Sequence, residues 1–468
     1  MTSKIITRFP PSPTGPLHIG NVRTALFNYL YARKHGGEII LRFEDTDRKR
    51  SKREYEDHAY ESLEWLGLQF DHIYRQSERG LIYRKYLEKM IAEGSAYVSK
   101  ELDLEYENTG GEDQDEESSE REHRDEVIRL KNPNKKVSFH DEVRGDIEVD
   151  TTELGDFVIA KSLEEPLYHF AVVVDDFEMG VTHVIRGEDG IYNTPRQILI
   201  QEAIGASRPI YCHIPFVFGP DKKKFSKRHG AISALDYRDE GIMPEALLNY
   251  LALLGWNPGT PQEIFTPKEL TEAFDLSKIQ KAGAVFDPNK LRWINQEHIK
   301  KMSDEAFKKH AYSALSGRIA NNPHWNEQRF DKLIPELKNR ITVFKDLDGM
   351  WENGEFDYLF ALPEYDPKLL IPVPKEGKAL TSKKVLKHLE WIHSAIEKLP
   401  EENFSKENVK EALWTYADKE GRGNVLWPLR IALSGKEKSP DPFTLSDILG
   451  KTEVLRRLME ACSLLRDA

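Results

Sequence analysis

The chain has 468 residues, with 39% hydrophobic and 31% charged residues and a formal net charge of −12. It contains no run of about 18 apolar residues, so the sequence predicts no membrane-spanning helix. Its N-terminal residues resemble neither a signal nor a transit peptide, so we expect a cytoplasmic protein with no membrane partner. The two distant cysteines, Cys212 and Cys462, exclude a disulfide framework and a Cys-type metal site.

Most of the negative charge lies between residues 101 and 126, which hold 13 Asp/Glu and 2 Arg, so the rest of the chain is close to neutral. Residues 106–125 are too polar to form a core and are predicted to be a solvated acidic loop. Their carboxylates would repel an RNA backbone at close range, so we expect this loop to lie away from any RNA partner.

The first hundred residues alternate between predicted strands and helices. Residues 4–9 and 38–43 are apolar strands, and the helix between them ends at Gly36. Two further helices end at Gly67 and Gly94. This order is typical of an α/β domain with a parallel sheet.

The same alternation returns after the acidic segment. Residues 181–187 form a predicted strand, and a helix follows with Thr194 as its N-cap and Pro195 in its first turn. Residues 211–219 are predicted as one further strand.

The pattern becomes helical from about residue 243. Residues 243–255 form a strongly apolar helix, and residues 381–400 form another. The apolar face of the second consists of Val385, Leu386, Leu389, Ile392 and Ile396. No alternating strand pattern follows residue 300, so this part is predicted to be all-α.

The loop after the first strand, "RFPPSPTGPLHIGN", has the composition of an anion site. It lacks the GxxxxGK[ST] spacing, but a helix begins near His18, and helix N-termini favour anions. Gly15 and Gly20 let a ligand approach the backbone, and His18 can donate to a phosphate. A capped turn with a surface histidine is the alternative.

A second motif, "KFSKR" at residues 224–228, lies 206 residues after the "HIG" motif. Together they resemble the "HIGH" and "KMSKS" signatures of class I aminoacyl-tRNA synthetases, which clamp ATP. Asn21 replaces the last histidine of the first signature, whereas the Lys-x-Ser-Lys pattern is complete.

Further blocks narrow the resemblance to glutamyl-tRNA synthetases of the bacterial type. They are "EIILRFEDTD", "YHFAVVVDDFEMGVTHVIRGEDGIYNTPRQ", "PEALLNYLALLGW" and "PLRIALSG". The similarity covers residues 4–100 and 127–300, and extends more thinly to the end. It implies a Rossmann-type α/β catalytic domain, split by an α+β acceptor-binding insertion and followed by an all-α anticodon-binding region.

The implied domain boundaries can be stated by residue number. They are 1–95 for the first catalytic half, 96–180 for the acceptor-stem insertion, 181–235 for the second catalytic half, 236–310 for a helical stem-contact region, and 311–468 for the anticodon-binding helices.

The resemblance implies a glutamate–tRNA ligase that forms glutamyl adenylate from L-glutamate and ATP and transfers glutamate to the 3′ end of tRNA(Glu). Mg²⁺ would accompany ATP, and the enzyme is expected to be a monomer. A form that also charges tRNA(Gln) and a non-catalytic RNA-binding relative remain alternatives. A glutaminyl enzyme should show strands in its C-terminal half, which this sequence lacks.

The resemblance also implies residue roles. The catalytic residues are His18, Ser226 and Lys227. The ATP-binding residues are Thr14, Gly15, His18, Gly20, Gly187, Asp189, Lys224 and Lys227. The glutamate-binding residues are Arg8, Ser12, Glu44, Tyr168 and Arg186, with the arginines on carboxylates and Glu44 on the ammonium group.

A sparse basic series in the last fifty residues could contact tRNA phosphates, although each member taken alone is more typical of solvated surface. Its members are Lys419, Arg422, Arg430, Lys436, Lys438, Lys451, Arg456 and Arg457, of which Arg430, Lys436 and Arg456 are the chosen candidates.

Two further features depart from the family pattern. Pro10 stands where the family usually has Ala, so no backbone donor is available there. The cysteine-rich zinc site that many relatives carry after "AEGSAYV" has no counterpart here, so no structural zinc is expected.

Overall fold

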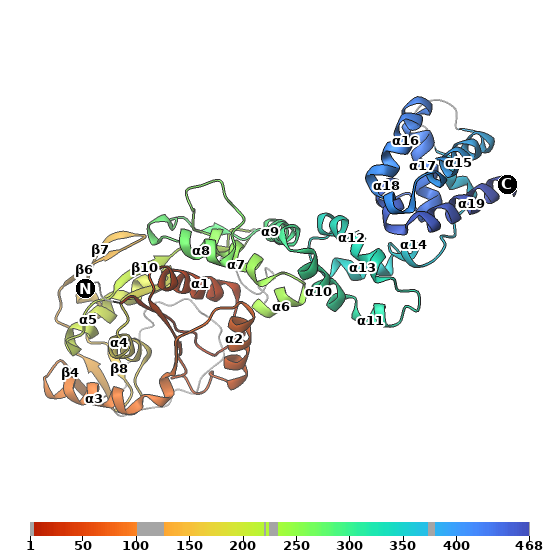
Figure 1. Cartoon of the computed structure of the whole chain (residues 1–468). Coiled ribbons are helices and arrows are strands. Elements are labelled where there is room, and N and C mark those ends of the chain that lie inside the picture. The colour runs from red at the N-terminus through yellow and green to blue at the C-terminus, as the bar shows by residue number, and fades with distance from the viewer. Residues whose placement is uncertain (1–3, 101–125, 220, 224–232, 373–379, 468) are drawn as a thin grey trace. The chain divides into compact units, whose positions relative to one another are not determined.

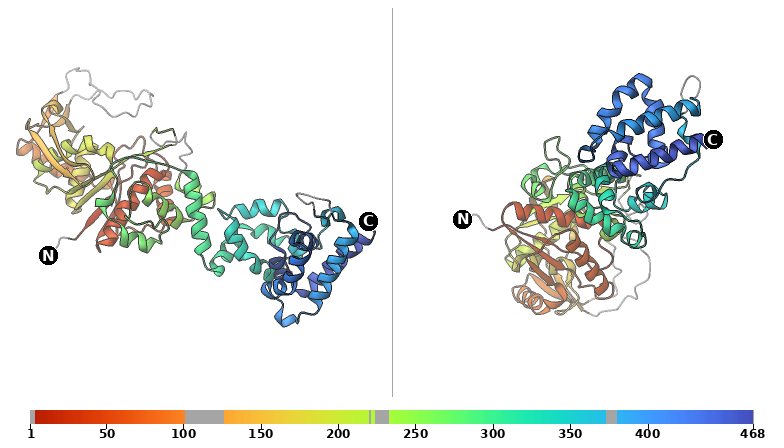
Figure 2. Two further views of the ribbon diagram at one scale, coloured as in Figure 1. Left: turned by 90° about the horizontal axis from the view of Figure 1, so that it is seen from above. Right: turned by 45° about the vertical axis from the view of Figure 1, so that its right-hand side comes forward.

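A computed structural model of the chain describes residues 4–100, 126–219, 221–223, 233–372 and 380–467. The chain forms two compact units, Met1–Ile294 and Asn295–Ala468, which are described separately (Figures 1 and 2). The predicted acidic loop and the "KFSKR" motif lie outside the described residues.

The N-terminal α/β alternation is confirmed. Strands β1 (Ile6–Phe9), β2 (Glu38–Phe43) and β3 (His72–Arg75) form a parallel sheet in the order β1-β2-β3. Helices α1 (Ile19–Lys34) and α2 (Arg53–Trp65) make the two crossovers. In α1, Val22, Ala25, Leu26 and Leu30 are buried at the spacing of an amphipathic helix.

The second half of the α/β domain lies beside the first (Figure 1). Strands β9 (His183–Gly187) and β10 (Ile210–Ile214) are parallel and connected by α5 (Thr194–Ile204). The Thr182 N–H donates to the Ile6 carbonyl at 2.9 Å, which joins β9 to β1. The carboxyl ends of these strands therefore meet at one edge.

The segment between the two halves forms an antiparallel sheet and a hairpin. The sheet has the order β4-β5-β8 and the hairpin consists of β6 and β7. The bounds are β4 (Ala96–Lys100), β5 (Glu126–Leu130), β6 (Lys136–Asp141), β7 (Gly145–Asp150) and β8 (Val158–Ala160), with helices α3 (Gly80–Ala92) and α4 (Tyr168–Glu178) on either side in sequence. Strand β6 also pairs with β10, at Asp141 opposite Tyr211.

Two local predictions are wrong. The strand predicted over residues 211–219 is interrupted at Pro215, because proline has no N–H to donate to a ladder, and β11 (Val217–Phe218) pairs separately with β12 (Ala284–Val285). Thr194 does not cap α5, because a 3₁₀ turn over Glu188–Asn193 precedes the helix and the Thr194 hydroxyl instead donates to the Gly190 carbonyl at 3.0 Å.

Helices make up the remainder, as predicted. The first unit continues with α6 (Ala234–Asp239), α7 (Pro244–Leu253), α8 (Pro267–Ala273) and the start of α9 (Pro288–Lys301). The second unit contains α10 (Asp304–Ala314), α11 (Ser316–Ala320), α12 (Glu327–Arg340), α13 (Asp346–Glu352), α14 (Asp357–Phe360), α15 (Ser382–Glu397), α16 (Lys406–Glu420), α17 (Arg422–Ser434), α18 (Pro442–Leu449) and α19 (Lys451–Asp467).

Every regular element that the structure describes beyond residue 300 is helical. In α15, Val385, Leu389, Ile392 and Ile396 are buried, which confirms the predicted apolar face, while Leu386 is half-buried. None of the helices in the described ranges is long and apolar enough to cross a membrane.

Candidate active site

Charged side chains gather where the parallel strands end. Arg8 is on β1, Glu44 directly follows β2, and Arg186 is near the end of β9. All three are buried, with exposed fractions of 1%, 6% and 9%. The crevice at the carboxyl ends of such strands is the usual ligand site of a doubly wound sheet, so their position agrees with a role in binding.

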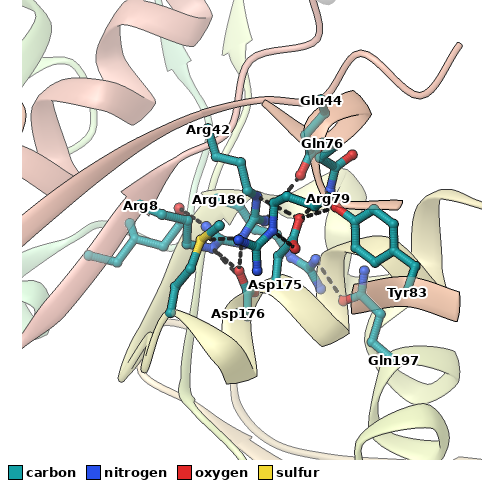
Figure 3. A network of polar contacts seen from close by, with 12 residues as sticks. Arg8, Arg42, Glu44, Gln76, Arg79, Tyr83, Asp175, Asp176, Arg186 and Gln197 are labelled. Carbon is teal, nitrogen blue, oxygen red and sulfur yellow. Dashed lines mark hydrogen bonds and ion pairs between the residues drawn. The ribbon is translucent and has the colours of Figure 1, made fainter. Parts of the chain in front are cut away.

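Arg42 on β2 is the centre of a buried ion cluster (Figure 3). Its guanidinium donates to Asp176 at 2.7 Å and to Glu44 at 3.2 Å, and it lies 3.7 Å from Asp175. Burial lowers the pKa of Arg42, but Asp176, Glu44 and Asp175 together raise it above its usual value. The positive charge of Arg42 is thus compensated within the protein.

The two aspartates extend this cluster to neighbouring elements. Asp176 also accepts from the Arg8 Nε at 3.3 Å. Asp175 accepts from Gln76 at 2.9 Å, from Arg79 at 2.6 Å and from the Tyr83 hydroxyl at 2.8 Å (Figure 3). Helix α4 is thereby fastened to β1, β2 and α3.

Glu44 has an altered acidity. Burial raises the pKa of its carboxyl to about 7, although the positive charges of Arg42 and Arg8 lower it. A carboxyl group that titrates near neutral pH at a strand end is a binding or catalytic candidate.

Arg186 differs from Arg42 in its partners. Its guanidinium donates to His213 Nε2 at 3.0 Å, to Gln197 Oε1 at 2.8 Å, to the Thr194 hydroxyl at 2.8 Å and to the Gly190 carbonyl at 3.0 Å. All four acceptors are uncharged, and no carboxylate among the described residues forms an ion pair with Arg186. Burial lowers the pKa of this guanidinium, so a ligand anion here would supply the missing countercharge.

The other two predicted glutamate-binding residues are more exposed. Ser12 lies on the loop after β1, and Tyr168, which is 41% exposed, begins α4. Burial of its hydroxyl raises the pKa of Tyr168, with Glu44 adding to the rise and Arg186 opposing it. The charges of Glu44 and Arg186 thus act on this hydroxyl in opposite directions.

The proline-rich loop is fastened by backbone hydrogen bonds. The Pro11 carbonyl accepts from the Glu44 N–H and the Pro13 carbonyl from the Lys52 N–H, both at 3.0 Å. The Leu17 N–H donates to the His58 ring at 3.3 Å. These bonds connect the loop to the residues that follow β2, so the loop has a fixed course.

His18 caps α1. Its Nδ1 accepts from the N–H groups of Gly20 at 3.1 Å and Asn21 at 3.4 Å, which places the ring proton on Nε2. A Cβ at Gly20 would lie 3.0 Å from this ring, so glycine gives the ring its space. The capped-turn interpretation is thus correct for Nδ1, and the donation of His18 to a phosphate stays a prediction.

The chain that follows the second motif contacts the first motif. Ser233 forms a β-bridge with His18, and the Ala234 N–H donates to the Leu17 carbonyl at 3.1 Å. Ser233 lies six positions after Lys227. The structure thus brings the chain just beyond "KFSKR" against "HIG", while Lys224, Ser226 and Lys227 themselves lie outside the described residues.

The remaining predicted ATP-binding residues lie at two places. Thr14 and Gly15 are on the proline-rich loop, where a Cβ at Gly15 would meet no atom within 4 Å. Gly187 ends β9 and Asp189 follows it, and a Cβ at Gly187 would lie 2.5 Å from the Asp189 carboxylate. Glycine at 187 therefore allows Asp189 to fold back over the backbone.

The predicted tRNA-binding residues are in the second unit, with Arg430 on α17, Lys436 in the segment after α17 and Arg456 on α19. Arg430 and Lys436 are half-buried. Arg456 is exposed and donates to Glu453 at 2.6 and 2.8 Å. Arg457 of the same basic series is 1% exposed and donates to the Ala361 carbonyl at 3.0 Å, so its inclusion as a phosphate contact is wrong.

Several site residues were missed by the sequence analysis. They are Arg42, Asp175, Asp176, Thr194, Gln197 and His213. Two adjacent acids inside the apolar run "FAVVVDDF" were the available signal, because a buried charge needs a partner. No local pattern marked Gln197 or His213.

Known proteins resemble this chain over its whole length. Residues 4–293 match the family described as "tRNA synthetases class I (E and Q), catalytic domain", and residues 299–462 match "Anticodon binding domain". The glutamate–tRNA ligase of Carboxydothermus hydrogenoformans is 39% identical, covering 97% of this chain and 98% of its own. That of Clostridium botulinum (strain Loch Maree) is 40% identical, covering 98% of each.

A solved structure also resembles this chain over nearly its whole length. A glutamate tRNA ligase from Elizabethkingia meningosepticum, described as in complex with its amino acid, has a TM-score of 0.80 and 31% identity. The similarity covers 98% of this chain and 99% of that one.

Proposed function

Because the chain belongs to the glutamyl-tRNA synthetase family of class I, we propose that the charged crevice at its strand ends is where glutamate and ATP react. The chain is a glutamate–tRNA ligase. Its reaction joins the α-carboxylate of glutamate to the α-phosphorus of ATP, releases pyrophosphate and passes the glutamyl group to the terminal ribose of tRNA.

Arg186 is the proposed ligand of the glutamate side-chain carboxylate. This role is supported by the four uncharged acceptors of Arg186, because no described residue forms an ion pair with its buried positive charge. The adjacent Gln197 Nε2 is buried and has no hydrogen-bond partner among the described residues. A carboxylate on Arg186 would offer oxygens to both groups.

The α-ammonium and α-carboxylate groups of glutamate are each assigned to a nearby side chain of opposite charge. Ionised Glu44 would bind the α-ammonium group, and Arg8 would attract the α-carboxylate, although Asp176 already shares its charge. Ser12 and Tyr168 would add hydroxyl donors. This arrangement orients the α-carboxylate for attack and excludes the reversed pose by charge.

The ATP site is proposed to lie between the two motifs. His18 Nε2 would donate to a phosphate oxygen, and Lys227 and Ser226 would stabilise the negative charge that develops on the phosphates. Lys224, Thr14, Gly15 and Gly20 would contact the nucleotide from the two loops, and Gly187 and Asp189 would contact its ribose. Mg²⁺ would enter with ATP and offset phosphate charge.

The tRNA is proposed to contact both units. Residues 96–180 would bind the acceptor stem, residues 236–310 would contact the stem, and residues 311–468 would bind the anticodon with Arg430, Lys436 and Arg456. We also propose that no cysteine-held zinc supports the insertion, because Cys212 and Cys462 are buried in different units. A monomer suffices for these roles.

The decisive experiment is Arg186→Ala in a charging assay with purified tRNA(Glu). Removal of one member of a buried charge pair costs about 3–5 kcal/mol, so KM for glutamate should rise by about 2 to 4 orders of magnitude, while KM for ATP changes much less. Arg208→Ala, at an exposed arginine paired with Glu202, is the matched control and should behave as wild type. Equal changes in both KM values for Arg186→Ala would contradict the assignment.

Two further measurements complete the test. Lys227→Ala should lower kcat by roughly 10²-fold or more with folding intact, and unchanged kcat would remove "KFSKR" from the chemistry. Charging of tRNA(Gln) compared with tRNA(Glu) would decide whether the enzyme discriminates between the two.

A further inference from the structure

A buried pair of residues lies behind Arg186 and was not among the predicted site residues. Asp141 ends β6 and His213 lies on the neighbouring strand β10, and both side chains have an exposed fraction of 0%. Asp141 Oδ2 lies 2.6 Å from His213 Nδ1 and also accepts from the His213 backbone N–H at 3.0 Å. The carboxylate therefore fixes both the ring and the backbone of His213.

This contact determines which ring nitrogen carries the proton. A carboxylate only accepts, so the proton of the neutral ring is on Nδ1 and the lone pair is on Nε2. That lone pair accepts the Arg186 Nε–H at 3.0 Å. Burial lowers the pKa of His213, although Asp141 raises it, so the ring is held neutral.

Asp141 is itself held by a short turn. Its Oδ1 accepts from the N–H groups of Val143 at 3.0 Å and Arg144 at 2.8 Å. The Arg144 side chain forms an ion pair with Glu188, which accepts from the Phe216 N–H at 2.7 Å. One turn of the β6–β7 hairpin therefore supports both the ring behind Arg186 and the segment that follows β9.

The opposite side of Arg186 is closed as well. A Cβ on Gly190 would lie 2.4 Å from Arg186 Nε and 2.7 Å from its Cδ. The guanidinium thus lies between the Gly190 backbone and the His213 ring, with Thr194 and Gln197 fixing its two terminal nitrogens.

We propose that Asp141 and His213 are positioning residues that aim the Arg186 guanidinium at the side-chain carboxylate of glutamate and so set the preference for glutamate over glutamine. The inference rests on the proposed role of Arg186. A neutral acceptor orients the guanidinium without neutralising it, so the full positive charge remains for the substrate. Glutamine, which is uncharged at that end, gains little from the same arrangement.

The test compares His213→Leu, which removes the acceptor, with His213→Gln, whose amide oxygen can reach the position of Nε2. Charging of tRNA(Glu) is measured with glutamate and with glutamine, together with KM for ATP and thermal unfolding. His213→Leu should lower kcat/KM for glutamate about 10- to 100-fold, the scale of a misplaced binding group. The kcat/KM for glutamine should change much less, so the preference for glutamate over glutamine falls by a similar factor. His213→Gln should restore most of that preference.

Two other variants approach the same guanidinium differently. Asp141→Asn replaces an acceptor oxygen by an NH₂ group that faces N–H donors, so the His213 proton is no longer fixed. Gly190→Ala keeps every hydrogen-bonding group and displaces Arg186 only by the volume of the added methyl group. It tests the positioning of Arg186 if the His213 variants do not fold. Both should reduce the preference for glutamate by about tenfold.

The outcomes separate this inference from the proposed function. If Arg186→Ala weakens glutamate binding but the His213 and Gly190 variants keep the preference, only the positioning role fails. Equal losses for glutamate, glutamine and ATP, or no rescue by His213→Gln, would show that the pair is only structural. A wild-type KM for glutamate in Arg186→Ala would overturn the role of Arg186 itself.

Discussion

Arg42 and Arg186 are both buried guanidinium groups at the strand ends of the first unit, yet Arg42 is surrounded by carboxylates and Arg186 by neutral groups. Arg42 lies among Asp175, Asp176 and Glu44, whereas every acceptor that the described part of the chain offers to Arg186 is neutral. A buried arginine whose charge is balanced by carboxylates of the protein holds neighbouring elements together, and one whose charge is not balanced can bind an anion. Burial alone would not have separated the two, because Arg42 is 0% and Arg186 is 9% exposed.

The largest effect is expected when Arg42 is removed. Arg42→Met leaves buried carboxylates without their shared cation, and breaking a buried pair costs about 3–5 kcal/mol. The free energy of unfolding in urea should fall by that amount. Arg33→Ala, at a partly exposed arginine paired with Asp71, is the control and should stay within about 1 kcal/mol of wild type. A stable Arg42→Met variant with altered glutamate KM would reverse the two roles.

The next largest effect is expected when Arg186 is given a carboxylate partner, as Arg42 has. Gln197→Glu places a carboxylate where Arg186 now has a neutral acceptor at 2.8 Å. The new ion pair competes with the substrate carboxylate, so KM for glutamate should rise about 10²-fold while stability changes little. Gln197→Met, which removes the acceptor without adding charge, is the companion variant and should have the smaller effect. If both variants behave alike, charge compensation is not what distinguishes Arg186.

The smallest predicted effect is a pH dependence from Glu44. With its pKa raised by burial to about 7, the carboxyl is mostly ionised at pH 8 and mostly protonated at pH 6. Only the ionised form can pair with the α-ammonium group, so kcat/KM for glutamate should rise about tenfold from pH 6 to pH 8. The profile of Glu44→Gln should lose this rise. An unchanged profile in that variant would assign the titration to another group.

Much of the fold was predictable because its signals are local. The strands at 4–9 and 38–43, the helix stops at glycine and the helical second unit all follow from short-range periodicity and turn residues. The prediction of one strand over 211–219 was wrong because Pro215 has no N–H for a ladder hydrogen bond and therefore interrupts the apolar run. The prediction of Thr194 as a helix cap was wrong because its hydroxyl donates to the Gly190 carbonyl and accepts from Arg186.

The sequence by itself determined the family, the two motifs and the candidate residues Arg8, Glu44 and Arg186, because these depend on residue type and order along the chain. Only the tertiary structure decided which arginine is compensated, and it revealed that Asp141 and His213 support Arg186. The physical reason is that the charge state and orientation of a buried group depend on which side chains surround it. Those neighbours come from β2, β6, β10, α4 and α5, whose meeting no local pattern encodes.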